Sequence, residues 1–180
     1  MERKIEIIIT DDHEIFTQSL MALLNGLAGM TVIGCAGNGA DLLKQLEIKV
    51  PHIVLLDLNM PVMNGEKTIN ILTVRYPELK ILVLSVDFQK DLIEKYYKLG
   101  VHGFMPKECN IEVLLEAIEL IMTNGKSQEL SFSYLAELKK QSLNLDDFVL
   151  SDREKEVLKL IGLGKRNKHI AYFLTIGGVF

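Results

Sequence analysis

The sequence predicts an α/β fold: a doubly wound parallel sheet of five strands with helices on both faces. Five strand-like segments alternate strictly with five helix-like segments over residues 4–124, and this alternation is typical of a parallel sheet. The third strand-like segment, Ile53–Leu56, is apolar at every position and runs directly into Asp57, as expected for a strand buried on both faces. Pro61 and Gly65 then mark a loop into the next helix.

The other four predicted strands are short runs of β-branched and other apolar residues that end at polar residues, proline or glycine. In chain order they cover residues 5–9, 31–36, 80–85 and 102–105. Because each is followed by a helix-like segment, we expect all five strands to be parallel and to present their carboxyl ends at one edge of the sheet.

Between the strands, apolar residues recur at spacings of three and four, which predicts five amphipathic helices. Their apolar positions are, in order, Phe16, Leu20, Leu23, Leu24 and Leu27; Leu42, Leu43 and Leu46; Ile69 and Leu72; Leu92, Ile93, Tyr96 and Leu99; and Val113, Leu114, Ala117, Ile118 and Ile121. Pro51 and Pro77 end the second and third helices, and Gly100 and Gly125 follow the fourth and fifth.

Length and composition fit one globular domain with a small additional piece. The chain has 180 residues, 48% of them hydrophobic, and no apolar run reaches the length of a membrane span. The amino terminus has no signal-peptide layout, and the two cysteines, Cys35 and Cys109, lack metal-ligand spacing. These features predict a cytoplasmic protein with reduced thiols and no membrane partner.

The residues after position 124 differ in character from the α/β region. We predict an α/β domain over 1–124, a linker over 125–149 with a short helix over 133–141, and a small helical domain over 150–180. Ser151 and Glu154 form a capping box at the start of a helix. Glycines then separate this helix from a second short one, as at the opening of a helix-turn-helix.

Charge also separates the two parts. Residues 151–180 carry six basic and three acidic side chains, whereas the whole chain has 20 basic and 24 acidic ones. A basic end on an acidic body indicates a surface that faces nucleic acid. The alternative at this point is a solvated helical face, and charge alone does not choose between the two.

Polar side chains end four of the predicted strands, and parallel topology brings them to one edge of the sheet, where ligands bind in open α/β folds. Crowded carboxylates and carbonyl oxygens suit Mg²⁺, and the backbone carbonyl of Asn59 would add one oxygen. A carboxylate beside a phosphoryl donor becomes a nucleophile that forms an acyl phosphate. The side chains are those of Asp11, Asp12, Asp57, Ser85 and Lys107.

These motifs, with Leu56–Pro61, Gly65 and Met105–Lys107 at their spacings, resemble the receiver domain of two-component response regulators, a flavodoxin-like (βα)5 fold, over about residues 4–124. The resemblance implies that a sensor histidine kinase phosphorylates Asp57. It also implies that Lys107 pairs with the phosphoryl oxygens, that Ser85 and Phe104 are the switch pair, and that Mg²⁺ is the cofactor. The implied magnesium ligands are Asp11, Asp12, Asp57 and the Asn59 carbonyl.

The segments Leu150–Ile161 and Gly164–Ala171 look like the LuxR-type helix-turn-helix of the NarL/FixJ class of regulators. This resemblance implies a DNA-binding transcription regulator. The family would continue after Ile176 with its recognition helix, whereas this sequence continues only with Gly177–Phe180. We therefore expect phosphate contacts without specific operator binding. The candidate phosphate contacts are Lys165, Arg166 and Lys168.

The main hypothesis is therefore a phosphorylation-controlled transcription regulator whose helix-turn-helix is shortened in this chain. The alternative is a receiver that acts through protein contacts or as a phosphate sink, without specific DNA binding. An aspartate-dependent phosphatase is disfavoured, because Asn59 stands where an acid would be required. Beyond slow self-dephosphorylation we expect no enzyme. The resemblance also implies homodimerisation through receiver helices.

Overall fold

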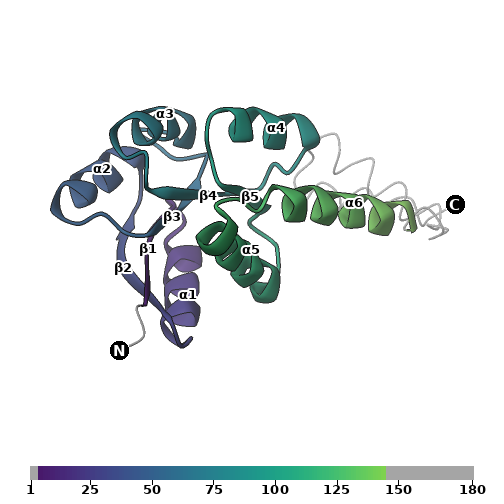
Figure 1. Cartoon of the computed structure of the whole chain (residues 1–180), viewed down its shortest axis with the longest axis horizontal. Helices are drawn as coiled ribbons and strands as arrows, with labels where there is room; N and C mark the ends of the chain where they lie inside the picture. The colour runs from purple at the N-terminus through teal and green to yellow at the C-terminus, as the bar shows by residue number, and fades with distance from the viewer. Residues whose placement is uncertain (1–3, 145–180) are drawn as a thin grey trace, which may run out of the picture. The chain divides into compact units, whose positions relative to one another are not determined.

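The computed structural model describes residues 4–144 and contains the predicted sheet (Figure 1). Its five strands are all parallel and lie in the order β2-β1-β3-β4-β5. They are β1 Ile5–Thr10, β2 Met30–Ala36, β3 Ile53–Asp57, β4 Lys80–Ser85 and β5 Gly103–Pro106. The predicted fold class is confirmed, and β3 is buried at every position, as its unbroken apolar run indicated.

Six helices accompany the sheet in the described part of the chain: α1 Glu14–Asn25, α2 Gly39–Ile48, α3 Gly65–Arg75, α4 Lys90–Lys98, α5 Ile111–Asn124 and α6 Gln128–Asn144. Helices α1 and α5 cover one face of the sheet, and α2, α3 and α4 cover the other (Figure 1). Among the described residues, no helix combines the length and apolar character needed to cross a membrane.

Alternate residues of each strand enter two separate cores. On β1, Ile7 and Ile9 pack toward α1 and α5, whereas Ile8 packs toward α2 and α3. The same alternation holds on β3, where Ile53 and Leu55 face one core and Val54 and Leu56 the other. The side-chain period of two in a strand produces this division. The two cores fix the sheet in place, and with it the edge where the polar residues meet.

Capping residues set several helix ends. The side chains of Asn38, Asn64 and Asn110 each accept a hydrogen bond from the backbone N–H three residues later, which satisfies a donor that the first turn leaves free. Gly100 and Gly125 have φ of 100° and 81°, a region that glycine enters without strain. The predicted glycine ends of the fourth and fifth helices are therefore confirmed.

The buried face of α1 is narrower than its apolar pattern suggested. Leu20 and Leu24 are buried with Thr17, whereas Leu23 is 55% exposed and Leu27 lies beyond the end of the helix. The apolar positions predicted for this helix cover a face so wide that the helix could pack on the sheet in either of two rotations about its axis. Contact with the sheet selected one of them.

The helix after residue 125 is longer than predicted and belongs in part to the α/β body. It runs over Gln128–Asn144 instead of 133–141, and the compact unit extends to Glu137. Ser131 and Leu135 are buried, and the Tyr97 hydroxyl lies 2.8 Å from Ser131 Oγ. The expected linker over 125–149 thus begins with residues that pack on the body. The predicted helical domain over 150–180 lies outside the described residues.

His102 supplies a pH dependence of stability. Burial, followed by the charges of Lys80 and Lys126, lowers the pKa of His102 from 6.5 to about 4, and its Nδ1 accepts a hydrogen bond from the Ile81 N–H. Between pH 6.5 and about 4, His102 is therefore protonated in the unfolded chain and neutral in the folded chain. We expect stability to fall as the pH drops from 6.5 toward 4, by about 1 kcal/mol at pH 5 because the ring is only half-buried.

Urea unfolding at pH 7.5 and pH 5 would measure this loss. A His102→Asn variant keeps an acceptor for the Ile81 N–H but does not titrate. Its loss of stability between the two pH values should be smaller than that of the wild type by about the same 1 kcal/mol. Equal losses in both proteins would show that other groups cause the acid sensitivity.

Candidate functional site

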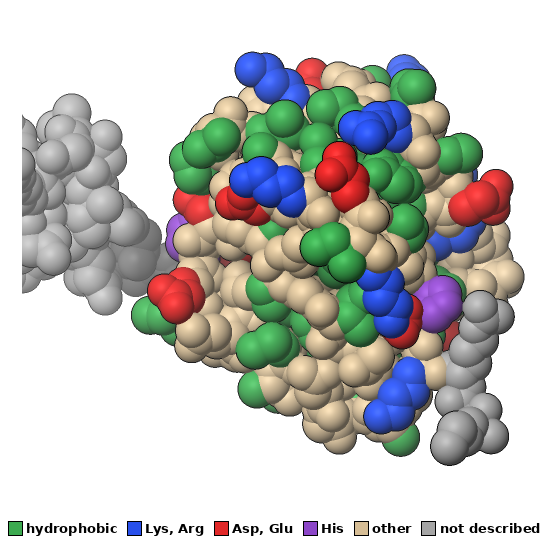
Figure 2. Space-filling model, turned by 90° about the vertical axis from the view of Figure 1, so that its left-hand side faces the viewer, with side chains coloured by type: hydrophobic (Ala, Val, Ile, Leu, Met, Phe, Trp, Pro, Cys, Tyr) green, Lys and Arg blue, Asp and Glu red, His purple; other side chains and the backbone are tan. Residues whose placement is uncertain are grey.

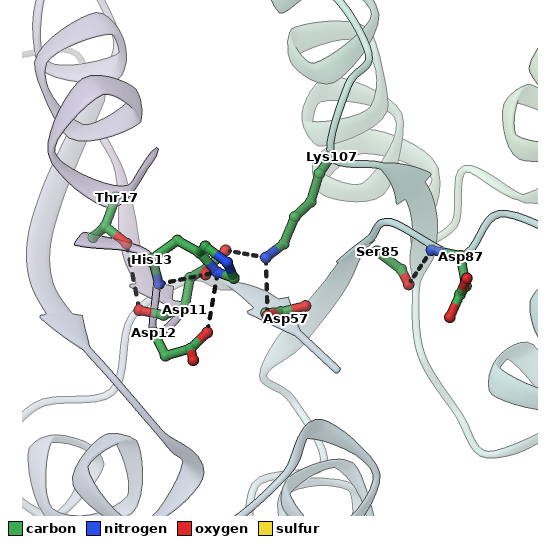
Figure 3. Close-up of polar contacts among 8 residues, drawn as sticks. All are labelled: Asp11, Asp12, His13, Thr17, Asp57, Ser85, Asp87 and Lys107. Carbon is green, nitrogen blue, oxygen red and sulfur yellow. Dashed lines mark hydrogen bonds and ion pairs between the residues drawn. The ribbon is translucent and has the colours of Figure 1, made fainter. Parts of the chain in front are cut away.

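A buried ammonium group joins two carboxylates at the carboxyl edge of the sheet. Lys107 Nζ lies 2.8 Å from Asp11 Oδ2 and 2.9 Å from Asp57 Oδ2 (Figure 3). The side chain of Lys107 is 10% exposed, and those of the two aspartates are 2% exposed. Charges so deeply buried are tolerated only when they are paired, so these three side chains form one electrostatic unit.

Strand order and strand register create this meeting. β3 lies between β1 and β4, and β5 follows β4, so the residues after β1, at the end of β3 and after β5 arrive at one edge. Asp57 aligns with Leu84 in β4, and the Lys107 N–H donates to the Ser85 carbonyl at 3.0 Å. Residues about a hundred positions apart in sequence are thereby brought within hydrogen-bond distance.

Opposing effects act on Lys107. Burial lowers the pKa of Lys107, but the attraction of the Asp11 and Asp57 carboxylates together outweighs burial, so the pKa lies above its ordinary value. The ammonium also lies 5.5 Å from the centroid of the Phe16 ring, a further favourable contact for a cation. Lys107 therefore stays charged at neutral pH and holds a positive charge beside Asp57.

One carboxylate oxygen of Asp57 has no hydrogen-bond partner and can accept a further ligand. Its Oδ2 is fully buried and has no well-aligned hydrogen-bond donor, although Lys107 Nζ lies 2.9 Å away. The short distance shows an ion pair, and the missing hydrogen bond shows that the ammonium is not directed along a lone pair of the carboxylate. The oxygen is paired in charge and remains open to a further ligand.

His13 is a member of the cluster that the sequence motifs did not indicate. The ring atom Nδ1 of His13 lies 3.1 Å from an oxygen of Asp11 and 3.1 Å from an oxygen of Asp12 (Figure 3). The backbone N–H of His13 donates to Asp11 Oδ1 at 2.9 Å. Ligand atoms of these three residues and Asp57 all lie within 4.8 Å of one another. The signal available in the sequence was position: His13 directly follows the aspartate pair at a strand end.

The cluster fits a hard divalent cation. Three carboxylates supply the oxygen ligands that Mg²⁺ prefers, and the Asp57 oxygen lacks an aligned partner. A cavity of about 500 Å³ borders Asp11 and Asp12 and continues between α1 and β2, so solvent reaches this side of the cluster. Asn59 lies in the exposed loop after β3, and the role of its carbonyl stays a prediction.

Ser85 and Phe104, the expected switch pair, make different contacts. Ser85 is buried, and its Oγ accepts a hydrogen bond from the Asp87 N–H at 3.1 Å (Figure 3). Phe104 is fully buried and stacks on Tyr96 and Phe88, with ring centroids 5.5 and 6.0 Å apart. The serine hydroxyl thus points to its own loop, and the aromatic ring already lies inside the protein.

Two family models match the chain. The model of the response regulator receiver domain matches residues 7–119, and the model of bacterial regulatory proteins of the luxR family matches residues 148–177. The chain belongs to the response regulator receiver family. The regulator therefore combines a receiver domain with a LuxR-type DNA-binding region, as the sequence motifs indicated, and the second match lies outside the described residues.

Curated relatives of this response regulator match nearly the whole chain. The chain is 31% identical to the transcriptional regulatory protein LnrK of Bacillus subtilis, covering 96% of this chain and 83% of LnrK. It is 32% identical to the nitrate/nitrite response regulator protein NarL of Escherichia coli, covering 94% and 81%. These matches favour the transcription regulator over the phosphate sink.

Solved structures agree with the fold of the regulator. An RcsB–DNA complex matches with a TM-score of 0.67 and 26% identity, covering 96% of this chain and 84% of that one. A DNA-binding response regulator of the LuxR family from Staphylococcus aureus matches with a TM-score of 0.60 and 25% identity, covering 64% and 97%. The receiver fold predicted from the sequence is thus also found in these structures.

Proposed function

We propose that this response regulator accepts a phosphoryl group on Asp57 from a sensor histidine kinase and that this modification controls its LuxR-type region. One observation carries the proposal: a buried aspartate at the end of the central strand lies 2.9 Å from a buried ammonium and belongs to a four-residue cluster of potential metal ligands. That combination supplies a nucleophile, a countercharge and a place for a divalent cation.

The chemistry follows from these neighbours. A carboxylate oxygen of Asp57 attacks the phosphorus of the phosphohistidine, the new P–O bond forms, and the P–N bond breaks with its electron pair leaving on the imidazole. Lys107 offsets the charge that the phosphoryl group brings. Bound Mg²⁺, which Asp11, Asp12, Asp57 and the Asn59 carbonyl would hold, supplies further neutralisation of the phosphoryl oxygens.

The proposed reaction ends with hydrolysis of the acyl phosphate by water. Asn59 lacks the acid/base group that a dedicated phosphatase requires two residues after its nucleophile. We therefore propose slow self-dephosphorylation and no separate enzymatic activity.

DNA binding is assigned to the region matched at residues 148–177. On the face of the described part that Figure 2 shows, basic and acidic side chains are interspersed, and no basic stripe of the kind that attracts phosphates is present there. Lys165, Arg166 and Lys168 remain the proposed phosphate contacts. Homodimerisation through α4 or α5 also stays a prediction, which sedimentation with and without acetyl phosphate would test.

Replacing Asp57 tests the central proposal. After incubation with acetyl phosphate and Mg²⁺, we expect intact-mass spectrometry of the wild type to show one added phosphoryl group, mapped to the peptide that contains Asp57. Asp57→Asn should show none, because an amide is not a nucleophile for this transfer. Asp41→Asn, a change at an exposed aspartate on α2, should be phosphorylated like the wild type. Labelling of the Asp57→Asn protein at another residue would contradict the proposal.

A further inference from the structure

His13 turns its ring toward the aspartates and does not cap α1. It is the residue directly before the helix, where a side chain that accepts a backbone hydrogen bond is favoured, but its side chain makes no capping hydrogen bond. The backbone N–H of His13 donates to Asp11 Oδ1 at 2.9 Å, and this local turn folds residue 13 back toward the aspartate pair. The position of the ring is therefore explained by the cluster and not by the helix.

The ring nitrogen is spaced from two carboxylate oxygens as neighbouring ligands of one cation are. Nδ1 of His13 lies 3.1 Å from Asp11 Oδ1 and 3.1 Å from Asp12 Oδ1 (Figure 3). Ligands that lie about 2.1 Å from an octahedral cation are about 3 Å apart along each edge of the octahedron. One ring N–H can align well with only one of the two oxygens, whereas a single cation contacts the nitrogen and both oxygens at once.

Asp57 adds a third oxygen to this set. One ligand atom each from Asp11, Asp12, His13 and Asp57 lie within 4.8 Å of one another. Opposite ligands of an octahedral cation are about 4.2 Å apart, so a small closure brings all four atoms into contact with one ion. The side chain of Asp57 is 2% exposed, and its Oδ2 has no hydrogen-bond partner. A buried oxygen of this kind is an independent indication that a ligand binds here.

The charge of the cluster also matches a dication. When the three aspartates are ionised they carry three negative charges, and the Lys107 ammonium offsets one of them. A neutral imidazole adds a ligand without adding charge, so two negative charges remain for the cation to neutralise. The side chain of His13 is 67% exposed, and the cavity of about 500 Å³ borders Asp11 and Asp12, so a hydrated ion can enter from this side.

A nitrogen ligand changes which cation binds best. Mg²⁺ prefers oxygen ligands, whereas imidazole favours first-row transition metals. We propose that His13 Nδ1 is a ligand of the cation at this site and that it makes the site prefer a first-row transition-metal dication to Mg²⁺. The inference rests on the cation site of the proposed function and adds to it a ligand and a selectivity.

Pulsed electron paramagnetic resonance of the full chain loaded with Mn²⁺ detects the ligand directly. In the wild type we expect the coupling of the Mn²⁺ electron spin to a directly bound nitrogen. His13→Phe, which keeps a ring but removes the nitrogen, should lose this coupling. His52→Asn is the matched control: it removes another imidazole and keeps an acceptor for the Glu6 N–H, which His52 Nδ1 accepts at 2.8 Å. This variant should keep the coupling.

Calorimetric titration with Co²⁺ and with Mg²⁺ measures the selectivity. We expect His13→Phe to weaken Co²⁺ binding about tenfold or more and Mg²⁺ binding less than about threefold, because only the transition metal gains from the nitrogen. His52→Asn should bind both ions at the strong site like the wild type. Equal weakening of both ions in His13→Phe would show that the ring shapes the site without selecting the metal, and would overturn the proposal.

The spectra separate this proposal from the one on which it rests. Wild type that binds Mn²⁺ without nitrogen coupling, or His13→Phe that keeps the coupling, would show that His13 is not a ligand while leaving the cation site intact. Wild type that binds none of the three ions would instead contradict the cation site itself.

Discussion

Lys107→Met is expected to lower the free energy of unfolding by about 3 kcal/mol when measured in EDTA. The substitution keeps the length and apolar stem of the side chain but removes the charge that lies 2.8 Å from Asp11 and 2.9 Å from Asp57. Two nearly fully buried carboxylates then face each other without a countercharge, and the cost of an unpaired buried charge is several kcal/mol. Urea unfolding curves would measure the difference.

Two further proteins isolate the cause. Lys44→Met removes an exposed lysine that lies 2.9 Å from Asp41, and because water screens this surface pair we expect its loss to change the free energy of unfolding far less than Lys107→Met does. The double variant Asp57→Asn/Lys107→Met removes one carboxylate together with the ammonium, so it should be more stable than Lys107→Met alone. A double variant no more stable than the single one would mean that lost packing, not charge, explains the result.

Gly65→Ala should destabilise the receiver by about 2–4 kcal/mol. A Cβ at this position would lie 2.7 Å from Leu58 Cα and even closer to the Asp57 carbonyl oxygen, both backbone atoms that cannot rotate away. The Gly65 N–H also donates to the Leu58 carbonyl at 2.9 Å, so the loop cannot open without losing that bond. Thermal unfolding of wild type and variant would measure the loss.

Gly37→Ala is the matched control for this substitution. A Cβ at Gly37 would meet no atom within 4 Å, so we expect a change in stability of less than about 0.5 kcal/mol. Because Gly65 is close to Asp57, the Gly65→Ala protein should also lose phosphorylation by acetyl phosphate, whereas Gly37→Ala should keep it. A Gly65→Ala protein as stable as the wild type would show that the loop after β3 yields easily.

Local patterns in the sequence were sufficient for the sheet and for most of the pocket. The unbroken apolar run of β3, the period of the helices and their glycine ends depend on residues within a few positions of one another. The alternation of strands and helices then requires a parallel sheet, and a parallel sheet places Asp11, Asp57 and Lys107 at one edge. The structure brings these three together through direct ion pairs.

The sequence alone determined the fold, because strand and helix periods and strand-end polarity are local properties with few topological solutions. Side-chain directions and the docking of α6 were decided by packing between segments that are distant in sequence. Only the tertiary structure showed that His13 turns back to the aspartates, that α6 joins the receiver through Ser131 and Tyr134, and that Phe104 is already enclosed. Side-chain direction and helix docking depend on which surfaces remain free once the sheet has formed, and no local pattern contains that information.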